Sequence, residues 1–460
     1  MASFTKTEIQ EATGASVAVS GEKTLFSGVE TDTRVIGRDA LFVALKGERF
    51  DGHDFVGKAV QQGAAGVIVS EMRDEYREYG IAVFVADDTL KAYQALARFH
   101  RRRFSIPVVA VTGSVGKTST RNMIASVLSQ KYDVLQTEKN FNNEIGLPRT
   151  LLQLTERHEA CVVEMGMRGL GQIAELAAIA EPTIGVVTNV GKSHIELLGS
   201  QENIAKAKSE LVLALDEKGT AVLNADDSFV APMAALCRGS VLTYGTEAGD
   251  DIWAEQIAVS EQGVPFPCHC GSDVFAAQIP AISRHHAYNG LAAAAVGCLT
   301  GLSAEEIRRG LAAYKGVPMR EELISLAPYT FINDAYNANP ASMSAAIRSL
   351  GALTTGRKIA VLGGMLELGD WAREEHEAIG REIASSGIDV LITMGELAGY
   401  IAGAAREGGM KQVYTAATHD ECAACLKELL QPGDTVLLKG SRRFAMEKIL
   451  SYFERKSCEC

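Results

Sequence analysis

The chain has 460 residues, of which 47% are hydrophobic and 22% charged, and its formal net charge is −12. This length exceeds what one hydrophobic core organises and predicts about three globular domains. The acidic balance argues against a nucleic acid as the main partner, because neutralising phosphates needs a basic face.

Two features of the sequence bear on location. The longest nearly apolar run, residues 291–302, is shorter than the roughly 20 residues of a membrane span, so we expect no membrane insertion. The first 14 residues include acidic side chains and no apolar signal segment. Nine cysteines, odd in number and unevenly spaced, then indicate a reduced, cytoplasmic protein.

Residues 1–105 mix short apolar runs with helical patterns. Strands are predicted at 40–45, 65–70 and 81–86, and helices at 54–63 and 89–104. The basic cluster Arg101–Arg103 is interpreted as a solvated helix end before a linker. These patterns predict a first α/β domain over residues 1–105.

From Pro107 to residue 313, strands and helices alternate. Strands are predicted at 108–113, 161–166, 183–191 and 219–226, with a helix at 204–215. Alternation of this kind predicts a parallel sheet covered by helices on both faces. The less regular segment 240–282 is predicted as antiparallel strands, followed by an alanine-rich helix after Tyr288.

A second α/β series begins near Tyr314 and forms a predicted third domain over residues 314–460. Its strand-like runs lie at 330–336, 358–364, 389–395 and 434–440, with helical patterns between them. The economical interpretation is therefore three α/β domains, with boundaries near residues 105 and 314.

The stretch "VTGSVGKTST" at 111–120 ends like a phosphate-binding loop, but only two residues separate Gly113 from Gly116, where the usual loop has four. An apolar strand precedes it and a helix follows, so free N–H groups and the positive helix end would face an anion. Lys117 would then reach the terminal phosphates, and the Thr118 hydroxyl a magnesium ion.

Two further side chains lie where a sheet would bind ligands. Glu164 ends one predicted strand and His194 follows another, and strand carboxyl ends meet at one edge of a parallel sheet. A carboxylate, a hydroxyl and a histidine there favour metal-assisted phosphate chemistry. Lys206 and Lys208 lie in the helix 204–215. The sequence pattern alone is compatible with both being ordinary solvent-exposed lysines.

Nine segments, in order, resemble the Mur peptide ligases, which add amino acids to the peptidoglycan precursor. They are "TDTR" (31–34), "LFVALKGERFDGHDF" (41–55), "KNFNNEIGLP" (139–148), "EMGMRGLGQI" (164–173), "TNVGKSHIELLGS" (188–200), "AKAKSEL" (205–211), "NDAYNANPASM" (333–343), "GGMLELGD" (363–370) and "LKGSRRFAMEKIL" (438–450). The short glycine loop is this family's form of the ATP loop. The asparagine-rich, "YNANP" and "MLELG" segments favour the member that adds D-alanyl-D-alanine.

The resemblance implies a central P-loop domain with a parallel sheet, between an N-terminal UDP-binding α/β domain and a C-terminal Rossmann-like α/β domain. It implies ATP, magnesium, UDP-N-acetylmuramoyl-tripeptide and D-alanyl-D-alanine as ligands of a cytoplasmic monomer that ligates through an acyl phosphate. ATP would contact Thr112, Gly113, Ser114, Val115, Gly116, Lys117, Thr118, Ser119, Asn289, Arg320, Asp334 and Asn337.

The remaining roles implied by the resemblance concern metal and acceptor substrate. Magnesium would be held by Thr118, Glu164, His194 and a carbamylated Lys208. The catalytic set would be Lys117, Glu164, His194 and Lys208. A carbamate would turn an ammonium into an anionic oxygen ligand. The uridine nucleotide would face Asp32, Thr33, Arg34, Lys46 and Gly47, and the muramoyl peptide Asn140, Asn142 and Asn143.

Five positions depart from the family pattern. Ser283 and His286 stand where the family has the first and last residues of Gly-Arg-His-Asn, and Gly364 replaces an aspartate. Lys192-Ser193 precede His194, where an alanine is more usual. None of these changes removes a metal or phosphate ligand, so they bear on fine contacts rather than on the reaction class.

Three alternatives remain beside this interpretation. A sibling ligase adding one amino acid is disfavoured, because no Asp-Asn-Pro-Arg motif is visible, and a phosphate-loop regulatory protein would need no amine substrate. The cysteine groups at 268–270, 422–425 and 458–460 lack the paired spacing of a zinc site and indicate apolar packing instead. Whether the acceptor's third residue is a diamino acid or lysine stays open.

Overall fold

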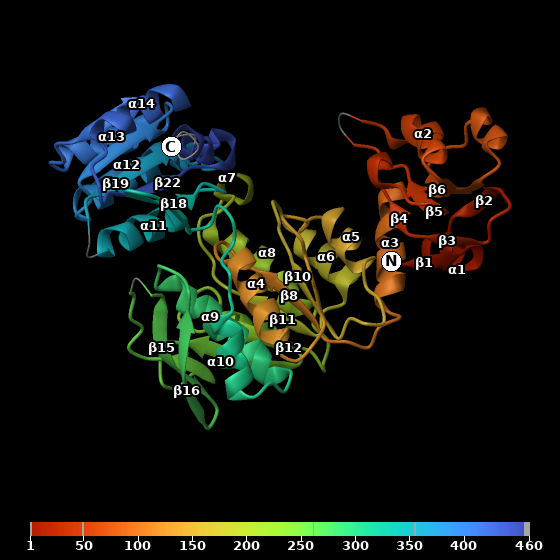
Figure 1. Ribbon diagram of the computed structural model, residues 1–460. Coiled ribbons are helices and arrows are strands. Elements are labelled where there is room, and N and C mark those ends of the chain that lie inside the picture. The colour runs from red at the N-terminus through yellow and green to blue at the C-terminus, as the bar shows by residue number, and fades with distance from the viewer. Residues whose placement is uncertain (1, 48–49, 261, 354–355, 455–460) are drawn as a thin grey trace.

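The structure, a computed structural model, describes residues 2–47, 50–260, 262–353 and 356–454. Three bodies follow one another along the chain, each built around its own sheet (Figure 1). We call them the N-terminal part (β1 to α3), the middle part (β8 to α10) and the C-terminal part (β17 to α15). The three-part α/β architecture is as predicted, whereas the boundaries near residues 105 and 314 remain predictions.

The N-terminal part carries a five-stranded sheet in the order β2-β7-β6-β5-β4, in which β2 is antiparallel to β7 and the other pairs are parallel. A separate antiparallel pair joins β1 to β3. The elements are β1 (Ser3–Thr5), α1 (Lys6–Thr13), β2 (Ser16–Val19), β3 (Leu25–Ser27), β4 (Val29–Glu30), β5 (Ala40–Val43), α2 (Val56–Gln61), β6 (Ala64–Val69), β7 (Ala82–Val85) and α3 (Thr89–Arg101).

The end of α3 is a junction between parts and not the solvated helix end predicted from the arginine cluster. Arg101 is buried, and its guanidinium donates to the main-chain oxygens of Ala180 and Glu181 at 2.9 and 3.1 Å. Arg102 pairs with the Glu181 carboxylate at 2.6 Å. The prediction of a solvated helix end is therefore wrong for Arg101, because α6 of the middle part ends here with carbonyl groups that need donors, whereas Arg102 and Arg103 are exposed as predicted.

The middle part contains a nine-stranded sheet in the order β16-β15-β14-β13-β12-β11-β8-β10-β9. All pairs from β9 to β14 are parallel, and β15 and β16 are antiparallel. The prediction of antiparallel strands over 240–282 is therefore wrong for β13, which extends the parallel sheet, and correct for β15 and β16. Strand β14 is parallel to β13 and antiparallel to β15. The strands are β8 (Val108–Thr112), β9 (Val134–Gln136), β10 (Ala160–Glu164), β11 (Ile184–Val187), β12 (Thr220–Asn224), β13 (Ser240–Gly245), β14 (Ile252–Ala254), β15 (Val264–Cys270) and β16 (Asp273–Ile279).

Helices cover both faces of this sheet. Alternate residues of β8 enter different apolar clusters: Val109 and Val111 pack with α4, α9 and α10, while Val108 and Ala110 pack with α6 and α8. A strand covered on both faces reads as a continuous apolar run, as predicted. The helices are α4 (Lys117–Leu128), α5 (Gly146–Leu151), α6 (Gln172–Ala180), α7 (Ile195–Leu198), α8 (Gln201–Leu213), α9 (His285–Leu299) and α10 (Ala304–Ala312). Helix α9 thus begins three residues before the predicted position.

The strand order places a ligand site at one edge of this sheet. Strand β8 comes first in the chain, yet it lies between β11 and β10, so the succession of strands reverses there. In open α/β sheets, ligands bind outside the carboxyl ends of the strands at such a reversal. The glycine loop, Glu164 and the segment that contains His194 follow β8, β10 and β11 at this edge.

The C-terminal part has a six-stranded sheet in the order β17-β18-β22-β19-β20-β21, with β17 antiparallel to β18 and the other pairs parallel. Four of these strands were predicted, whereas β17 and β21 were not. The elements are β17 (Glu322–Leu326), β18 (Tyr329–Asp334), α11 (Pro340–Ala352), β19 (Lys358–Gly363), α12 (Ala372–Ala384), β20 (Val390–Met394), α13 (Ala398–Glu407), β21 (Val413–Ala416), α14 (His419–Leu429), β22 (Thr435–Lys439) and α15 (Ser451–Glu454).

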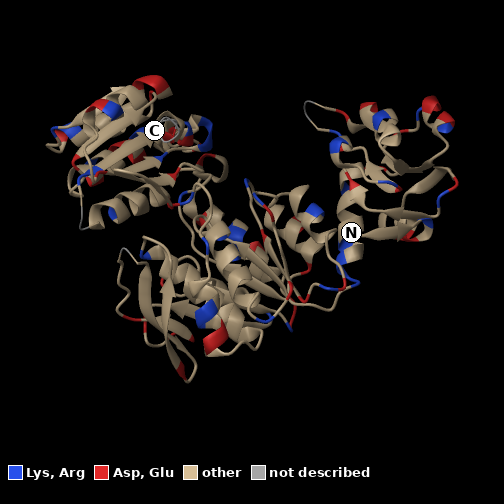
Figure 2. Cartoon of the chain, in the orientation of Figure 1, with Lys and Arg blue, Asp and Glu red and all other residues tan. Residues whose placement is uncertain are grey.

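Short 3-10 helices complete the secondary structure. They lie at Thr33–Val35, Gly52–Phe55, Asp74–Tyr79, Ala231–Leu236, Gly369–Trp371, Arg442–Phe444 and Met446–Leu450. In the view of Figure 2, lysines and arginines are interspersed with acidic residues over all three parts. Within the described chain, no helix is long and apolar enough to cross a bilayer.

The cysteines differ from expectation at one pair, because the sulfur atoms of Cys270 and Cys298 are bonded. Cys422 is buried among apolar residues and Cys425 packs against the same cluster, as predicted for structural thiols. The group at 458–460 and residues 48–49 of the segment 41–55 lie outside the described residues.

Candidate functional site

The loop between β8 and α4 needs both of its glycines. Gly113 has a φ of 154°, and a Cβ there would lie 1.9 Å from the Thr188 hydroxyl. Gly116 precedes α4 with a φ of 84°, and its Cβ would lie 2.8 Å from the Asn289 side-chain oxygen. A side chain at either position would therefore collide with a neighbour and strain the backbone. The short spacing is a compact loop that opens a helix.

The loop after β11 holds the glycine loop in shape. Val115 N–H donates to the Asn189 side-chain oxygen at 2.8 Å, and the carbonyl oxygen of Val115 accepts bonds of 2.8 Å from both Thr188 and Asn189 side chains. The Ser114 hydroxyl donates to Gly191 O at 3.1 Å and accepts from Gly191 N–H at 2.8 Å. The loop is therefore fixed in its cradle shape by main-chain and amide contacts.

Lys117 is the first residue of α4, and its side chain folds back over the glycine loop where a phosphate is predicted to bind. Its ammonium donates to Gly113 O at 2.6 Å and to Ser114 O at 3.3 Å. Burial lowers the pKa of Lys117 to about 8, and the nearby Glu164 carboxylate opposes this shift. Carbonyl oxygens stabilise an ammonium less than a phosphate anion does, so the side chain is poised to bind one.

Glu164 ends β10 with a fully buried carboxylate. Its oxygens accept from the Asn142 side chain at 2.7 Å and lie 3.4 Å from the Arg121 guanidinium. A buried carboxylate must be paired or bind a metal. Asn142, predicted on the muramoyl-peptide side, thus contacts the same carboxylate that is predicted to bind magnesium.

His194 reaches the site from the loop after β11, with a left-handed φ of 61°. Its Nδ1 lies 2.6 Å from a carboxylate oxygen of Glu367, a residue of the C-terminal part. Burial lowers the pKa of His194, whereas Glu367 opposes that shift. A proton on Nδ1 bonded to this carboxylate leaves the Nε2 lone pair available as a ligand.

The two lysines of α8 differ in burial. Lys206 is exposed, whereas Lys208 has only 2% of its surface accessible. Among the described residues, the Lys208 ammonium has no hydrogen-bond or ion-pair partner, and burial lowers its pKa well below the usual value, followed by the effect of Lys117. The sequence was compatible with solvent exposure of both lysines. The structure shows that Lys206 is exposed and that Lys208 is not.

These side chains fit a magnesium ion in part as they stand. Glu164 supplies carboxylate oxygen and Thr118 a buried hydroxyl from the first turn of α4, which are the oxygen ligands that magnesium prefers. His194 adds a nitrogen with a free lone pair. Lys208 as an amine offers no such oxygen, but an unpartnered, buried lysine with a lowered pKa is reactive towards carbon dioxide.

A large cavity of about 1000 Å³ lies between the glycine loop and the C-terminal part. Most predicted ATP, metal and peptide residues line it: Ser114, Val115, Gly116, Lys117, Thr118, Ser119, Asn140, Asn142, Asn143, Glu164, His194, Arg320, Asp334 and Asn337. Thr112 lies beneath the loop, where its hydroxyl donates to Met165 O at 3.0 Å. Asn143 also caps α5 through Gly146 N–H at 2.9 Å.

A second cavity of about 350 Å³ opens beside the loop, and Asn289 lines it together with Gly116, Asn189 and Tyr288. The Asn289 oxygen accepts from Thr120 at 3.1 Å, while its Nδ2 is buried with no partner among the described residues. A buried amide donor without a partner is costly unless a ligand completes it. The position of this donor fits the predicted adenine contact.

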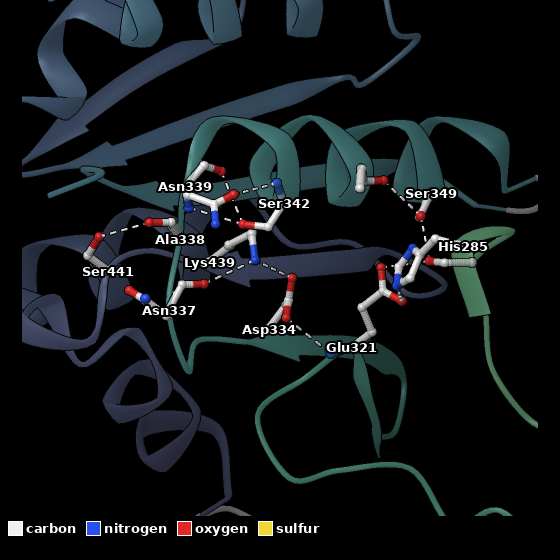
Figure 3. Close-up of polar contacts among 12 residues, drawn as sticks. His285, Glu321, Asp334, Asn337, Ala338, Asn339, Ser342, Ser349, Lys439 and Ser441 are labelled. Carbon is white, nitrogen blue, oxygen red and sulfur yellow. Dashed lines mark hydrogen bonds and ion pairs between the residues drawn. The ribbon is translucent and has the colours of Figure 1, made fainter. Parts of the chain in front are cut away.

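The C-terminal part supplies the opposite wall of the large cavity. Figure 3 shows the Lys439 ammonium between the Asp334 carboxylate, at 2.5 Å, and the main-chain oxygen of Asn337, at 3.2 Å. The Arg320 guanidinium stacks 4.2 Å from the centre of the Tyr336 ring. All five groups come from segments that lie far from the glycine loop in sequence.

The five residues predicted at the uridine nucleotide lie in the N-terminal part, away from this cavity lining. Arg34 is mostly exposed and pairs with Asp32 at 2.6 Å, which holds the pKa of Asp32 at about 2. Thr33 is buried, Lys46 approaches Asp51 at 3.8 Å, and Gly47 N–H donates to Phe50 O at 2.9 Å. A substrate that reaches both places must be long.

Several cavity residues were not singled out from the sequence. They are Glu321, Tyr336, Asn339, Glu367, Lys439, Ser441, Arg442 and Arg443. Many lie inside segments that carry the family resemblance, such as 333–343 and 438–450, so the sequence already marked these segments as functional. Which of their side chains face the cavity depends on how the parts meet, and no local pattern contains that information.

Comparison with known proteins agrees with this geometry. The Mur ligase family catalytic domain matches residues 25–101, the Mur ligase middle domain residues 111–297, and the Mur ligase glutamate ligase domain residues 319–442. The chain belongs to the Mur ligase family. The three matches fall on the three parts of the structure in the same order.

Individual relatives of this Mur ligase carry one name. The UDP-N-acetylmuramoyl-tripeptide–D-alanyl-D-alanine ligase of Bacillus subtilis is 40% identical over 93% of each chain, and that of Escherichia coli is 36% identical over 94% of each. The crystal structure of MurF from Acinetobacter baumannii is 32% identical, covers 99% of both chains and superposes with a TM-score of 0.92. MurF from Thermotoga maritima in complex with ADP is 29% identical, covers 93% of this chain and 97% of its own, and has a TM-score of 0.83.

The position at which this Mur ligase lacks the usual aspartate has a packing reason. A Cβ on Gly364 would lie 3.0 Å from both Leu397 and the Phe444 ring, so a larger side chain would need both neighbours to move. The other four departures, Lys192, Ser193, Ser283 and His286, all make polar contacts to the C-terminal part or to the segment that leads into it.

Proposed function

We propose that this Mur ligase joins D-alanyl-D-alanine to UDP-N-acetylmuramoyl-tripeptide with ATP, releasing ADP and phosphate. The observation that carries the proposal is the set of relatives with this name, similar over more than nine-tenths of the chain and up to 40% identical. The glycine loop facing Glu164, His194 and Arg320 across one cavity supports it. The product is a precursor for peptidoglycan synthesis.

The cavity suggests how phosphoryl transfer proceeds. The loop N–H groups and Lys117 hold the β- and γ-phosphates of ATP at the start of α4. The acceptor carboxylate takes the γ-phosphoryl group and becomes an acyl phosphate, and the amine of D-alanyl-D-alanine then attacks its carbonyl carbon. The tetrahedral intermediate collapses to the amide and phosphate. Lys117 stabilises the charge that develops on the transferred group.

Thr118, Glu164, His194 and Lys208 are the proposed magnesium residues. Bound magnesium supplies charge neutralisation at the phosphates. Arg121 and Asn142 hold the Glu164 carboxylate in place, and Glu367 orients the His194 ring through Nδ1. His194 acts as a ligand rather than as a base in this proposal.

Lys208 is proposed to carry a carbamate. As an ammonium it would be a buried charge without a partner, next to Lys117. The neutral amine attacks carbon dioxide and loses a proton, and the resulting carbamate is an anion beside a cation. The lowered pKa makes the neutral amine accessible near neutral pH, which favours this reaction.

The two ends of the acceptor substrate are assigned to different parts of the chain. Asp32, Thr33, Arg34, Lys46 and Gly47 bind the uridine nucleotide in the N-terminal part, while Asn140, Asn142 and Asn143 face the muramoyl peptide at the cavity. Asn289, Arg320, Asp334 and Asn337 bind the adenosine and phosphates of ATP. We also propose a cytoplasmic monomer, since all its substrates are soluble.

The decisive experiment measures phosphate release from ATP with the UDP-muramoyl-tripeptide and D-alanyl-D-alanine, each omitted in turn. Release should need both, and the product should be heavier by the dipeptide residue mass. Strong release with a single amino acid would instead assign the chain to another Mur ligase activity. Release that needs neither substrate would contradict ligation altogether.

Lys117→Ala tests the phosphate assignment separately. We expect ATP turnover to fall by at least roughly 100-fold, the usual loss when a charge-stabilising donor is removed. Lys206→Ala, an exposed lysine of α8, is the control and should leave turnover unchanged. An unaffected rate in Lys117→Ala would remove the loop from the mechanism.

A further inference from the structure

The Glu321 carboxylate lies buried where the middle and C-terminal parts meet. One oxygen accepts from the Ser283 hydroxyl at 2.6 Å, and the other lies 3.1 Å from His286 Nε2. Ser283 and His286 belong to the start of α9, and both are almost fully buried. The Ser283 hydroxyl also lies 2.5 Å from that of Ser349 in α11. The segment Ser283–His286, at the start of α9, thus holds the carboxylate, and Ser349 of α11 contacts it only through Ser283.

Glu321 is ionised in this setting. Burial by itself raises the pKa of Glu321, but His285, His286 and Ser283 together lower it to about 2. His285 Nε2 lies 3.7 Å away, and burial lowers the pKa of His285 to about 4, so this ring is neutral near neutral pH. The ligand atoms of His285, His286 and Glu321 all lie within 4.8 Å. Direct hydrogen bonds already occupy both carboxylate oxygens, so no ion is needed to explain the cluster.

The backbone around Arg320 is strained. Met319 and Glu321, on either side of Arg320, have left-handed φ values of 59° and 49°. Residues with a Cβ avoid this region and keep it only where their surroundings impose it, often beside a functional site. Tyr336 N–H donates to Met319 O at 3.1 Å, and Glu321 N–H donates to Asp334 at 3.3 Å.

This turn aims two side chains in different directions. Arg320 lies on the Tyr336 ring and lines the large cavity, together with Asp334. Glu321 reaches instead to Ser283 and His286 at the start of α9. The bonds made by the Glu321 side chain therefore oppose relaxation of the turn that carries Arg320.

We infer that Ser283 and His286 are positioning residues for ATP, which hold Arg320 towards the nucleotide by fixing the Glu321 carboxylate. The inference rests on the proposed function, because it takes Arg320 to contact ATP. Both positions are departures from the Gly-Arg-His-Asn pattern, and a glycine at position 283 has no side chain to bond Glu321.

The test combines His286→Ala with Arg320→Ala in the full ligation assay. His286→Ala should raise KM for ATP roughly 3- to 10-fold, which corresponds to the net contribution of about one ordinary hydrogen bond. The KM for D-alanyl-D-alanine should stay the same. In an Arg320→Ala background, His286→Ala should have no further effect on KM for ATP, since the side chain that it positions is gone.

Two further variants distinguish positioning of Arg320 from a general loss of structure. His286→Gln keeps a donor near Glu321 and should restore KM for ATP to within about twofold of the parent. His158→Ala, a buried histidine bonded to Thr155 far from the cavity, is the matched control and should leave KM for ATP unchanged. If His286→Ala does not fold, Ser283→Ala replaces it, with the same expectations.

Three outcomes would overturn the inference. One is an equal rise in the KM values of ATP and the dipeptide, and another is a His286→Ala effect that persists undiminished in the Arg320→Ala background. The third is an Arg320→Ala protein with unchanged KM for ATP. That result would remove Arg320 from the nucleotide site while leaving the ligase activity itself intact, so the two failures are distinguishable.

Discussion

Lys117 lies close enough to Lys208 to lower the pKa of Lys208 further, yet the two lysines have different surroundings. Lys117 donates to two carbonyl oxygens of the glycine loop, whereas Lys208 has no partner among the described residues. A hydrogen-bonded ammonium near the surface keeps part of its solvation, and a buried, unpartnered one loses it. The same residue type therefore serves as a phosphate donor at one position and as a reactive amine at the other.

This difference predicts how stability depends on pH in buffer free of carbon dioxide. The unfolded Lys208 has its usual pKa of 10.5 and binds a proton that the folded protein binds weakly, so the unfolded chain holds more protons. Stability then rises as the pH increases from 7 towards 10. Lys208→Met removes this contribution and should be the more stable protein at pH 7.

Chemical denaturation of the wild type and Lys208→Met at pH 7 and 10 measures the effect. Lys117, whose pKa is about 8, contributes with the same sign in both proteins, so it cancels in the difference. The gap between the two proteins should narrow at pH 10. A gap that does not change with pH would contradict a buried ammonium at this position.

At the scale of elements, β8, the glycine loop and α4 act as one unit. Strand β8 is buried on both faces, and α4 packs against α9 and α10, so both ends of the loop are anchored. The loop after β11 then fixes the carbonyl oxygen of Val115 and the Ser114 side chain. A rigid cradle of this kind binds phosphate without reorganising first.

Gly113→Ala should break this unit. The added Cβ would meet the Thr188 hydroxyl at 1.9 Å, so the loop or the segment after β11 must move. We expect ATP turnover to fall at least roughly 100-fold and the thermal midpoint by several degrees. Gly399→Ala in α13, where nothing lies within 4 Å, is the matched control and should keep both values. Normal turnover in Gly113→Ala would show that the close approach of the loop is not required.

At the scale of the whole molecule, one short segment of the middle part binds the C-terminal part at three consecutive residues. Lys192 pairs with Glu375 at 2.6 Å, the Ser193 hydroxyl accepts from Asn339 at 2.8 Å, and His194 meets Glu367 at 2.6 Å. In Figure 1 the C-terminal part lies over the end of the middle sheet that carries α4 and α7. These contacts close the cavity at the phosphate end.

Glu375→Ala should loosen this closure and let water reach the acyl phosphate. Phosphate released per amide bond formed should then rise from one towards about two, a modest change because the Lys192–Glu375 pair is partly exposed. Glu377→Ala in the same helix, whose partners are Arg373 and Arg381 of α12, is the control and should keep the ratio at one. An unchanged ratio in Glu375→Ala would mean that this pair does not protect the intermediate.

Local patterns were sufficient for much of this fold. Continuous apolar runs located β8, β10 and β11, since strands covered on both faces lose the alternation of polar residues. Two glycines before Gly-Lys-Thr identified the loop, and strand ends located Glu164 and the neighbourhood of His194. Each of these inferences depends on a few adjacent residues, and that is the range over which sequence determines structure directly.

Other features were decided only by tertiary structure. The direction of β13 and β14 depends on distant strands, and the fate of Arg101 depends on where α6 ends. Lys206 and Lys208 look alike in sequence, and only the packing of α8 leaves Lys206 exposed and Lys208 buried. The contacts of Glu367 with His194 and of Glu321 with His286 join residues that lie far apart in the chain. The sequence by itself thus determined most of the elements, the loop and the family. The packing of three parts decided which side chains meet, because burial and pairing are properties of the assembled surfaces.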